Sequence, residues 1–167
     1  MRRQSLRLRI DNDTWFEVCN IGNGDFIPLK GFMGSVDYIN VVENMHLNNG
    51  APWTIPITLD VPEEIVDDVK KTEELILTNY LNEDIARLFV EDIYKVDYEK
   101  DLIKVFGTND IKHPGVKKEK SRSVYRVGGE VKVDIYMEDT FNEYALTPKE
   151  TRILFNKVKW TTVTGFQ

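Results

Sequence analysis

The chain has 167 residues, of which 41% are hydrophobic and 30% are charged, a size and composition typical of one globular domain with an ordinary core. This composition excludes disordered, collagen-like and disulfide-stapled proteins. The 22 Lys and Arg against 28 Asp and Glu leave a net charge of -6, which is the wrong sign for a domain that works mainly by gripping nucleic-acid phosphates.

The cysteine count and the hydropathy pattern indicate the compartment. Cys19 is the only cysteine, so no intramolecular disulfide can form, and we interpret it as a small buried hydrophobe. The arginines of the N-terminus are not followed by an apolar run, and no segment approaches the roughly 18 apolar residues that span a bilayer. We therefore expect a cytoplasmic protein with no membrane contact.

The first elements are a strand and a packed loop. Residues 5–10 alternate apolar and polar side chains, as a half-buried strand does. Residues 11–19 break that pattern, and Gly22 and Gly24 permit a tight backbone path. Residues 26–34 are apolar but punctuated by Pro and Gly, which predicts a packed loop.

A helix and a strand are predicted next. Ser35 is the expected N-cap of a helix whose apolar positions recur at helical spacing, at Val36, Ile39, Val42 and Met45. Residues 53–61 alternate over nine positions and predict a strand at a sheet edge, because Pro56 cannot donate to a ladder.

The middle of the chain predicts an antiparallel pair and a capped helix. An acidic connector, residues 62–71, leads to strands at 75–77 and 85–90, which are joined too closely to be parallel. Asp97 can cap a short helix that ends at Gly107.

The last part predicts a hairpin and a helix. Gly128-Gly129 lies between two β-prone runs and predicts a two-residue turn. Thr147-Pro148-Lys149-Glu150 combines a capping box with proline at the first helical position, and Ile153, Leu154 and Val158 supply a buried stripe. Residues 161–167 are β-prone. With three short helices and several short strands, we expect a small α+β fold, mainly β, with a mostly antiparallel sheet or pseudo-barrel.

The titratable residues do not form a complete catalytic site. His46 and His113 have no ligands at zinc-site spacing, so we expect no metal, and His113-Pro114-Gly115 is interpreted as turn architecture. The glycines at 22 and 24 lack the spacing of a phosphate cradle. Neighbouring carboxylates are interpreted as solvated faces: Asp67-Asp68, Glu73-Glu74 and Glu91-Asp92.

Residues 112–126 are the one basic region, with six Lys or Arg and one Glu. Together with Tyr125 they would suit backbone attraction and base stacking. The acidic remainder of the chain favours a solvated or interdomain surface instead.

Two long segments carry specific motifs, residues 20–38 (NIGNGDFIPLKGFMGSVDY) and 45–61 (MHLNNGAPWTIPITLDV). They are followed by 90–94, 105–110 with 113–116, the glycine pair at 128–129 and 146–152. In their sequence and order these segments resemble those of the ATP sulfurylases (sulfate adenylyltransferases). The family pattern usually has Ser where Ile27 stands and Thr where Lys30 stands.

The resemblance implies a two-part chain. Residues 1–146 would form an N-terminal PUA-like domain, and residues 147–167 would be the helix and strand that lead into a nucleotidyltransferase domain. Gln167 resembles the glutamine that hydrogen-bonds sulfate in an intact enzyme. The family's other sulfate- and ATP-binding motifs follow this position, so we expect no catalytic and no metal-binding residue in this chain.

The residues that match family motifs are expected to have structural roles. They are Pro28, Gly31, Phe32, Met33, Asp37, Tyr38, Trp53, Pro56, Gly107, His113, Pro114, Gly115, Gly128 and Gly129.

The resemblance also implies substrates and partners. The intact family enzyme converts Mg-ATP and sulfate to adenylyl sulfate and pyrophosphate in sulfate assimilation. This chain itself would need no cofactor and would be inactive alone, as a scaffold that contacts the catalytic domain in cis or in trans, with a homo-oligomer left open. The alternative is a free-standing PUA-like module that binds RNA or a protein through residues 112–126.

Overall fold

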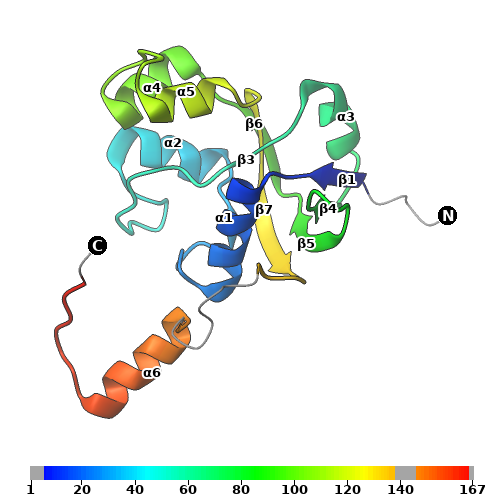
Figure 1. Ribbon diagram of the computed structural model, residues 1–167. Helices are drawn as coiled ribbons and strands as arrows, with labels where there is room; N and C mark the ends of the chain where they lie inside the picture. Colours follow the sequence, from blue (N-terminus) through cyan, green and yellow to red (C-terminus); the bar gives the residue numbers. More distant parts are fainter. Residues whose placement is uncertain (1–5, 138–145, 166–167) are drawn as a thin grey trace.

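The computed structural model describes residues 6–137 and 146–165 (Figure 1). Its strands are β1 (Leu6–Arg9), β2 (Gly31–Phe32), β3 (Leu59–Asp60), β4 (Glu74–Thr78), β5 (Asp84–Phe89), β6 (Asp92–Lys95) and β7 (Tyr125–Val133). Its helices are α1 (Asn12–Asn23), α2 (Ser35–Asn44), the 3-10 turn η1 (Glu63–Ile65), α3 (Val66–Val69), α4 (Tyr98–Phe106), α5 (Pro114–Lys120) and α6 (Pro148–Val158). The part of the chain that is described therefore has more helices than the three that were expected.

One curled sheet organises the fold, and β7 is its central strand (Figure 1). The strand order is β1-β4-β5-β7-β2, and β3 and β6 also pair with β7. Among the described strands β1 and β4 are parallel, while all other pairs are antiparallel. This confirms the predicted α+β pseudo-barrel of mostly antiparallel strands.

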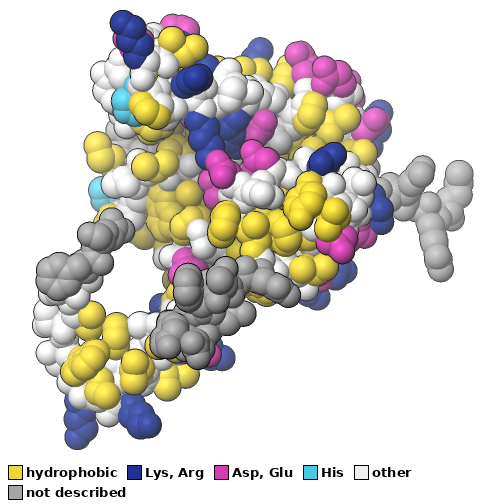
Figure 2. All heavy atoms as spheres, viewed as in Figure 1, with side chains coloured by type: hydrophobic (Ala, Val, Ile, Leu, Met, Phe, Trp, Pro, Cys, Tyr) yellow, Lys and Arg dark blue, Asp and Glu magenta, His cyan; other side chains and the backbone are white. Residues whose placement is uncertain are grey.

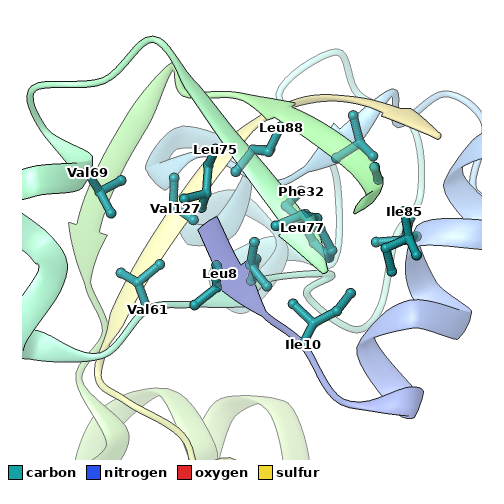
Figure 3. Close-up of a cluster of buried hydrophobic side chains, with 14 of the residues drawn as sticks. Leu8, Ile10, Phe32, Val61, Val69, Leu75, Leu77, Ile85, Leu88 and Val127 are labelled. Carbon is teal, nitrogen blue, oxygen red and sulfur yellow. The ribbon is translucent and has the colours of Figure 1, made fainter. Parts of the chain in front are cut away.

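The core lies against one face of this sheet, as the alternating sequences of the strands require. Figure 3 shows Leu8, Leu75, Leu77 and Leu88 pointing into it from three neighbouring strands, where all are buried. The next residue of each strand points the other way. Burial of each such side chain stabilises the fold by about 1.5–3 kcal/mol.

The opposite face of the sheet carries a cross-strand row. Arg7 lies opposite Ile76, Ile76 opposite Arg87, and Arg87 opposite Lys132. Arg87 makes a two-point ion pair with Asp134. The strand predicted at 5–10 and the pair predicted at 75–77 and 85–90 are thus confirmed.

The predicted hairpin at Gly128-Gly129 is wrong, because β7 runs straight through both glycines. Gly129 has a φ of 151°. A Cβ at Gly129 would lie 1.8 Å from the carbonyl oxygen of Phe89. The glycines here allow backbones to approach each other closely and do not turn the chain.

The strand predicted at 53–61 is also wrong over most of its length. Leu59–Asp60 alone joins the sheet as β3. Pro56 interrupts the backbone donors, and Ile55, which should point inward, is exposed. The indole of Trp53 donates to the carbonyl of Ile55 at 2.8 Å, which holds this segment as a loop.

Residues 11–19 were predicted to be irregular, but residues 12–19 belong to the helix α1. Asp11 caps this helix by accepting a hydrogen bond from the amide of Thr14 at 2.8 Å. Gly24, with a φ of 81°, closes it. The apolar residues Trp15, Val18 and Ile21 recur at three-residue spacing, so the signal for a helix was present in the sequence.

The helix predicted after residue 34 is confirmed, although its details differ. Gly34 is the N-cap, and Ser35 is the first helical residue. The buried residues of α2 are Val41 and Val42, whereas three of the predicted apolar positions are exposed. These exposed positions are Val36, Ile39 and Met45.

The predicted caps of the later helices are confirmed. Asp97 caps α4, and Gly107 ends it with a φ of 73°. The capping box of Thr147 and Glu150 begins α6. The stripe of α6 is not buried, however, since no residue of this helix is buried.

Two further segments differ from the prediction. The acidic connector 62–71 contains η1 and α3. Residues 161–165 form no strand, and 166–167 lie outside the described residues. None of the described helices is long and apolar enough to cross a membrane.

Candidate functional site

Four glycines allow three backbone segments to meet at the centre of the fold. A Cβ at Gly31 would lie 1.9 Å from the carbonyl oxygen of Gly129, and one at Gly128 would lie 2.6 Å from the backbone of Gly34. Neither position could accept a side chain without displacing a neighbouring backbone. We call this arrangement of Gly31, Gly34, Gly128 and Gly129 the glycine crossing.

A cleft of about 210 Å³ lies beside the glycine crossing. Its lining residues are Pro28, Leu29, Lys30, Gly31, Phe32, Met33, Gly34, Asp37, Glu91, Gly129 and Glu130. Six of the residues assigned to family motifs are therefore brought together at one place.

Hydrogen bonds fix the loop that forms one wall of this cleft. The hydroxyl of Tyr94 donates to the carbonyl of Met33 at 2.9 Å. The carboxylate of Asp92 accepts from the amide and the hydroxyl of Ser35, at 2.7 and 2.5 Å. Asp37 accepts from the amide of Asn48 at 2.7 Å. Asp92 was interpreted as a solvated charge, but it joins β6 to the start of α2.

Tyr38 and Pro56 line a second, smaller cavity of about 40 Å³. The hydroxyl of Tyr38 donates to the buried carboxylate of Asp101 at 2.8 Å, which ties α2 to α4. Burial, and then the charge and hydrogen bond of Asp101, raise the pKa of Tyr38 well above its usual range. This phenol stays protonated and acts as a hydrogen-bond donor.

The other motif residues have local packing contacts. The ring of Trp53 meets Phe26 edge to face, with centroids 5.9 Å apart. The ring of His113 lies 5.1 Å from that of Phe106, and Pro114 begins α5. A Cβ at Gly115 would lie 2.7 Å from the Phe106 ring, so a glycine there lets α5 approach α4.

The two histidines lie in different surroundings. His46 belongs to the loop after α2, where its Nδ1 lies 2.6 Å from the carbonyl oxygen of Asn44. The Nδ1 of His113 is buried and has no hydrogen-bond partner. Across the described residues, no three side chains of the metal-ligating types gather in a way that could hold an ion. Gln167 lies outside the described residues.

The basic segment 112–126 is largely neutralised within the fold. Arg126 is 1% exposed and pairs with Glu119 at 3.1 Å. Arg122 pairs with Glu119 at 2.8 Å and with Asp60 at 2.9 Å. Lys118 pairs with Asp13 at 2.8 Å. The sequence pattern did not reveal this network, because alternation with Val127 assigns Arg126 to the exposed face of β7, whereas Tyr98 of α4 and Glu119 of α5 contact it there and it is buried.

A polar cavity of about 210 Å³ lies between α1 and the end of α5. Its lining residues are Asp11, Asp13, Thr14, Glu17, Asp60, Lys118, Ser121 and Arg122. Burial raises the pKa of Glu17 from 4.5 to about 7, although Arg122 and Lys118 oppose this shift. Sequence reasoning did not find Glu17 either.

The sequence matches a known family of domains. A family model described as a PUA-like domain matches residues 2–134. The chain belongs to the PUA-like domain family.

The chain is also similar to curated enzymes along almost its whole length. It is 38% identical to a sulfate adenylyltransferase of Ignicoccus hospitalis over 165 residues, which are 99% of this chain and 43% of that protein. It is 40% identical to a sulfate adenylyltransferase of Pyrococcus abyssi over 96% of this chain and 41% of that protein. The chain thus spans about two fifths of the length of these relatives.

A solved structure supports the fold alone. It is described as a hexameric APS kinase from Thiobacillus denitrificans, and it superposes with a TM-score of 0.66 at 24% identity. The similarity covers 94% of this chain and 27% of that one.

Within this PUA-like domain the motif residues divide into packing roles. The glycine crossing brings together β2, β7 and the start of α2, while Tyr38 joins α2 to α4 and Gly115 lets α5 approach α4.

Proposed function

We propose that this chain is the N-terminal PUA-like domain of a sulfate adenylyltransferase and that it acts as a scaffold, not as the catalyst. The observation that supports this most is the 38–40% identity to sulfate adenylyltransferases along 96–99% of this chain. The roles of the motif residues in packing agree with a scaffold.

Catalysis and structural contacts would belong to different domains. The catalytic residues would lie in a nucleotidyltransferase domain supplied in cis or in trans, and residues 147–167 would lead into it. Mg-ATP and sulfate would be substrates of that complete enzyme, and the PUA-like domain would provide interdomain and subunit contacts. The 167-residue chain alone would release no pyrophosphate from Mg-ATP and sulfate.

The test is the mass of the polypeptide in its native cells, probed with an antibody against residues 6–137. We expect a band at least about twice the 19.4 kDa of this chain, with sulfate-dependent pyrophosphate release by the immunoprecipitate. A band at 19.4 kDa without a co-purifying nucleotidyltransferase would overturn the proposal.

The alternative RNA-binding role has no support from the basic segment. Arg122, Arg126 and Lys118 are engaged in ion pairs, so few cations remain to neutralise phosphates. Titration with a single-stranded RNA at low and moderate salt distinguishes the two roles, because binding that weakens steeply with salt would favour the RNA-binding module.

A further inference from the structure

The smaller cavity beside Tyr38 is lined by carboxylates and by no cation. Its lining comes from α2, α4, α5 and the loop before β3, and Figure 1 shows these three helices gathered at one end of the molecule. Its charged lining residues are Asp101 and Glu119, and no lysine or arginine lines it. We call it the Asp101 cavity.

The carboxylate of Asp101 is nearly buried and keeps an acceptor to spare. Asp101 is 8% exposed. It accepts from the hydroxyl of Tyr38 at 2.8 Å and from the amide of Asp97 at 3.0 Å, and both bonds end on Oδ2. Because an ionised carboxylate has about four lone-pair sites on its two oxygens, Oδ1 is the acceptor that Asp101 offers to a ligand.

The lysines of α4 do not neutralise Asp101. Lys100 and Lys104 both pair with Glu43 of α2, Lys100 at 3.0 Å. Within the part of the chain that the structure describes, no ion pair reaches Asp101. A buried carboxylate without a cationic partner is costly, so a cation that enters the cavity is stabilised there.

The arginines near the cavity are held by other carboxylates. Arg122 pairs with Asp60 and Glu119, and Arg126 pairs with Glu119. Figure 2 shows acidic and basic side chains side by side over α5 and α1, so the charges of this region are interspersed and not gathered by sign. Glu119 is therefore already neutralised, and Asp101 is the carboxylate of the cavity lining that still lacks a cation.

Size and apolar surface limit what the cavity can hold. Its volume of about 40 Å³ has room for about three water-sized groups, since one such group needs roughly 10–15 Å³. Ile55, Pro56, Val105 and Phe106 supply apolar surface beside the acid. Across the described residues no three metal-ligating side chains gather to hold an ion. The cavity therefore suits a short alkyl chain that ends in a small cation.

We propose that the Asp101 cavity binds a primary ammonium group on a short alkyl chain. The ammonium donates to Oδ1 of Asp101, and its methylene groups lie against Ile55, Val105 and Phe106. An ammonium is a compact charge with three donors, whereas a guanidinium is a wider planar fork. A free amine and the end of a lysine side chain share this chemistry. The inference is independent of the proposed function.

The experiment is a titration of the 167-residue chain with ethylammonium chloride, followed by the backbone amide chemical shifts of α4. We expect saturable shifts with a Kd of about 1 mM or weaker, the range that a ligand of this size can reach. Ethanol has the same number of non-hydrogen atoms but no charge, and sodium chloride matches the ionic strength. Neither control should give saturable shifts at these amides.

Substitutions locate the binding site. Asp101→Asn should weaken binding at least about tenfold, because the amide still accepts from Tyr38 and Asp97 but has lost the charge. Glu99→Gln is the matched control, since it removes a charge from the same helix at a side chain that is 78% exposed, and it should leave the affinity unchanged. Val105→Phe fills the cavity while Asp101 stays in place, and it should abolish binding. Circular dichroism checks that each variant is folded.

A second titration separates the two sources of the ammonium group. The probes are Nα-acetyl-lysine N-methylamide and the norleucine compound of the same shape, which lacks the nitrogen and should not bind. Binding of the lysine compound at least about tenfold tighter than ethylammonium assigns the cavity to a lysine side chain of a protein segment. Equal or weaker binding assigns it to a free amine.

Other outcomes overturn the proposal. An unsubstituted chain that shows no saturable shift up to about 100 mM ethylammonium does so, and so does ethanol that binds equally well, because the charge then has no part in binding. If a folded Asp101→Asn variant keeps the affinity, or if Glu99→Gln lowers it equally, the cation binds elsewhere. If Asp101→Asn does not fold, Val105→Phe and the comparison with ethanol decide. None of these results alters the proposed enzyme assignment, which the native mass tests separately.

Discussion

The glycine at position 129 shows how much one residue determines in this fold. Its φ of 151° and its approach to Phe89 leave no room for a side chain. Because β7 pairs with β2, β3, β5 and β6, a displacement there would disturb the whole sheet.

Gly129→Ala is therefore expected to destabilise the domain by at least about 3 kcal/mol, or to prevent folding. Gly50→Ala is the matched control: Gly50 also has a positive φ, of 84°, but nothing lies within 4 Å of its added Cβ. It should cost only about 1 kcal/mol. Urea unfolding of both variants measures the difference, and equal costs would show that close approach is not what selects glycine.

Glu17 gives a second prediction at the residue scale. Its folded pKa of about 7 lies above its ordinary value of 4.5, so the folded state binds the proton more tightly than the unfolded state does. The stability that this proton contributes is present below about pH 4.5 and is lost as the pH rises through about 7.

Glu17→Gln should therefore stabilise the domain at pH 8, by roughly 1–3 kcal/mol, and should flatten its stability between pH 5 and pH 8. The charged groups that face Glu17 are Asp11, Lys118, Glu119 and Arg122, and they stay in place in this variant. Urea midpoints across this pH range give the measurement. Glu64→Gln, at an exposed position of η1, is the control. Parallel pH profiles for Glu17→Gln and the unsubstituted chain would contradict the prediction.

At the scale of elements, the sequence predicted where helices begin better than it predicted which way the chain runs at Gly128-Gly129. The caps of α4 and α6 are formed by their neighbouring residues, so Asp97 and Thr147 could be recognised from sequence alone. The role of Gly128-Gly129 could not, because it depends on the backbones of residues 31–34 and 89, far away in the chain. The same holds for Arg126, whose partner Glu119 makes a buried arginine acceptable.

For the candidate site too, the sequence identified residues but not how they come together. The sequence identified Pro28, Gly31, Met33 and Asp37 as motif residues, but their meeting in one cleft follows from the sheet. Glu17 had no local signal at all, because its surroundings come from α1, α5 and β3.

The capping box of α6 gives a prediction at the element scale. Because no residue of α6 is buried, the stability of this helix depends on interactions within its own segment, such as its capping box. Thr147→Ala should cost the helix about 1 kcal/mol, which lowers the helical population of residues 148–158 in backbone chemical shifts. The thermal midpoint of residues 6–137 should not change, and a fall in both would show that α6 is coupled to the core.

At the scale of the whole molecule, the chain divides into a domain with a core and a helix without one. The buried hydrophobic residues all lie between Leu8 and Val131 among the described residues. The match to the PUA-like family ends at residue 134. The division predicted at residue 146 stays a prediction, and it can be tested by removing the part beyond the core.

A chain that ends after Met137 should fold and unfold like the longer chain, because every core contact that the structure describes is retained. Its unfolding free energy, measured by urea titration, should differ from that of the longer chain by less than about 0.5 kcal/mol. If the shortened chain fails to fold, residues beyond 137 complete the core and the boundary lies later.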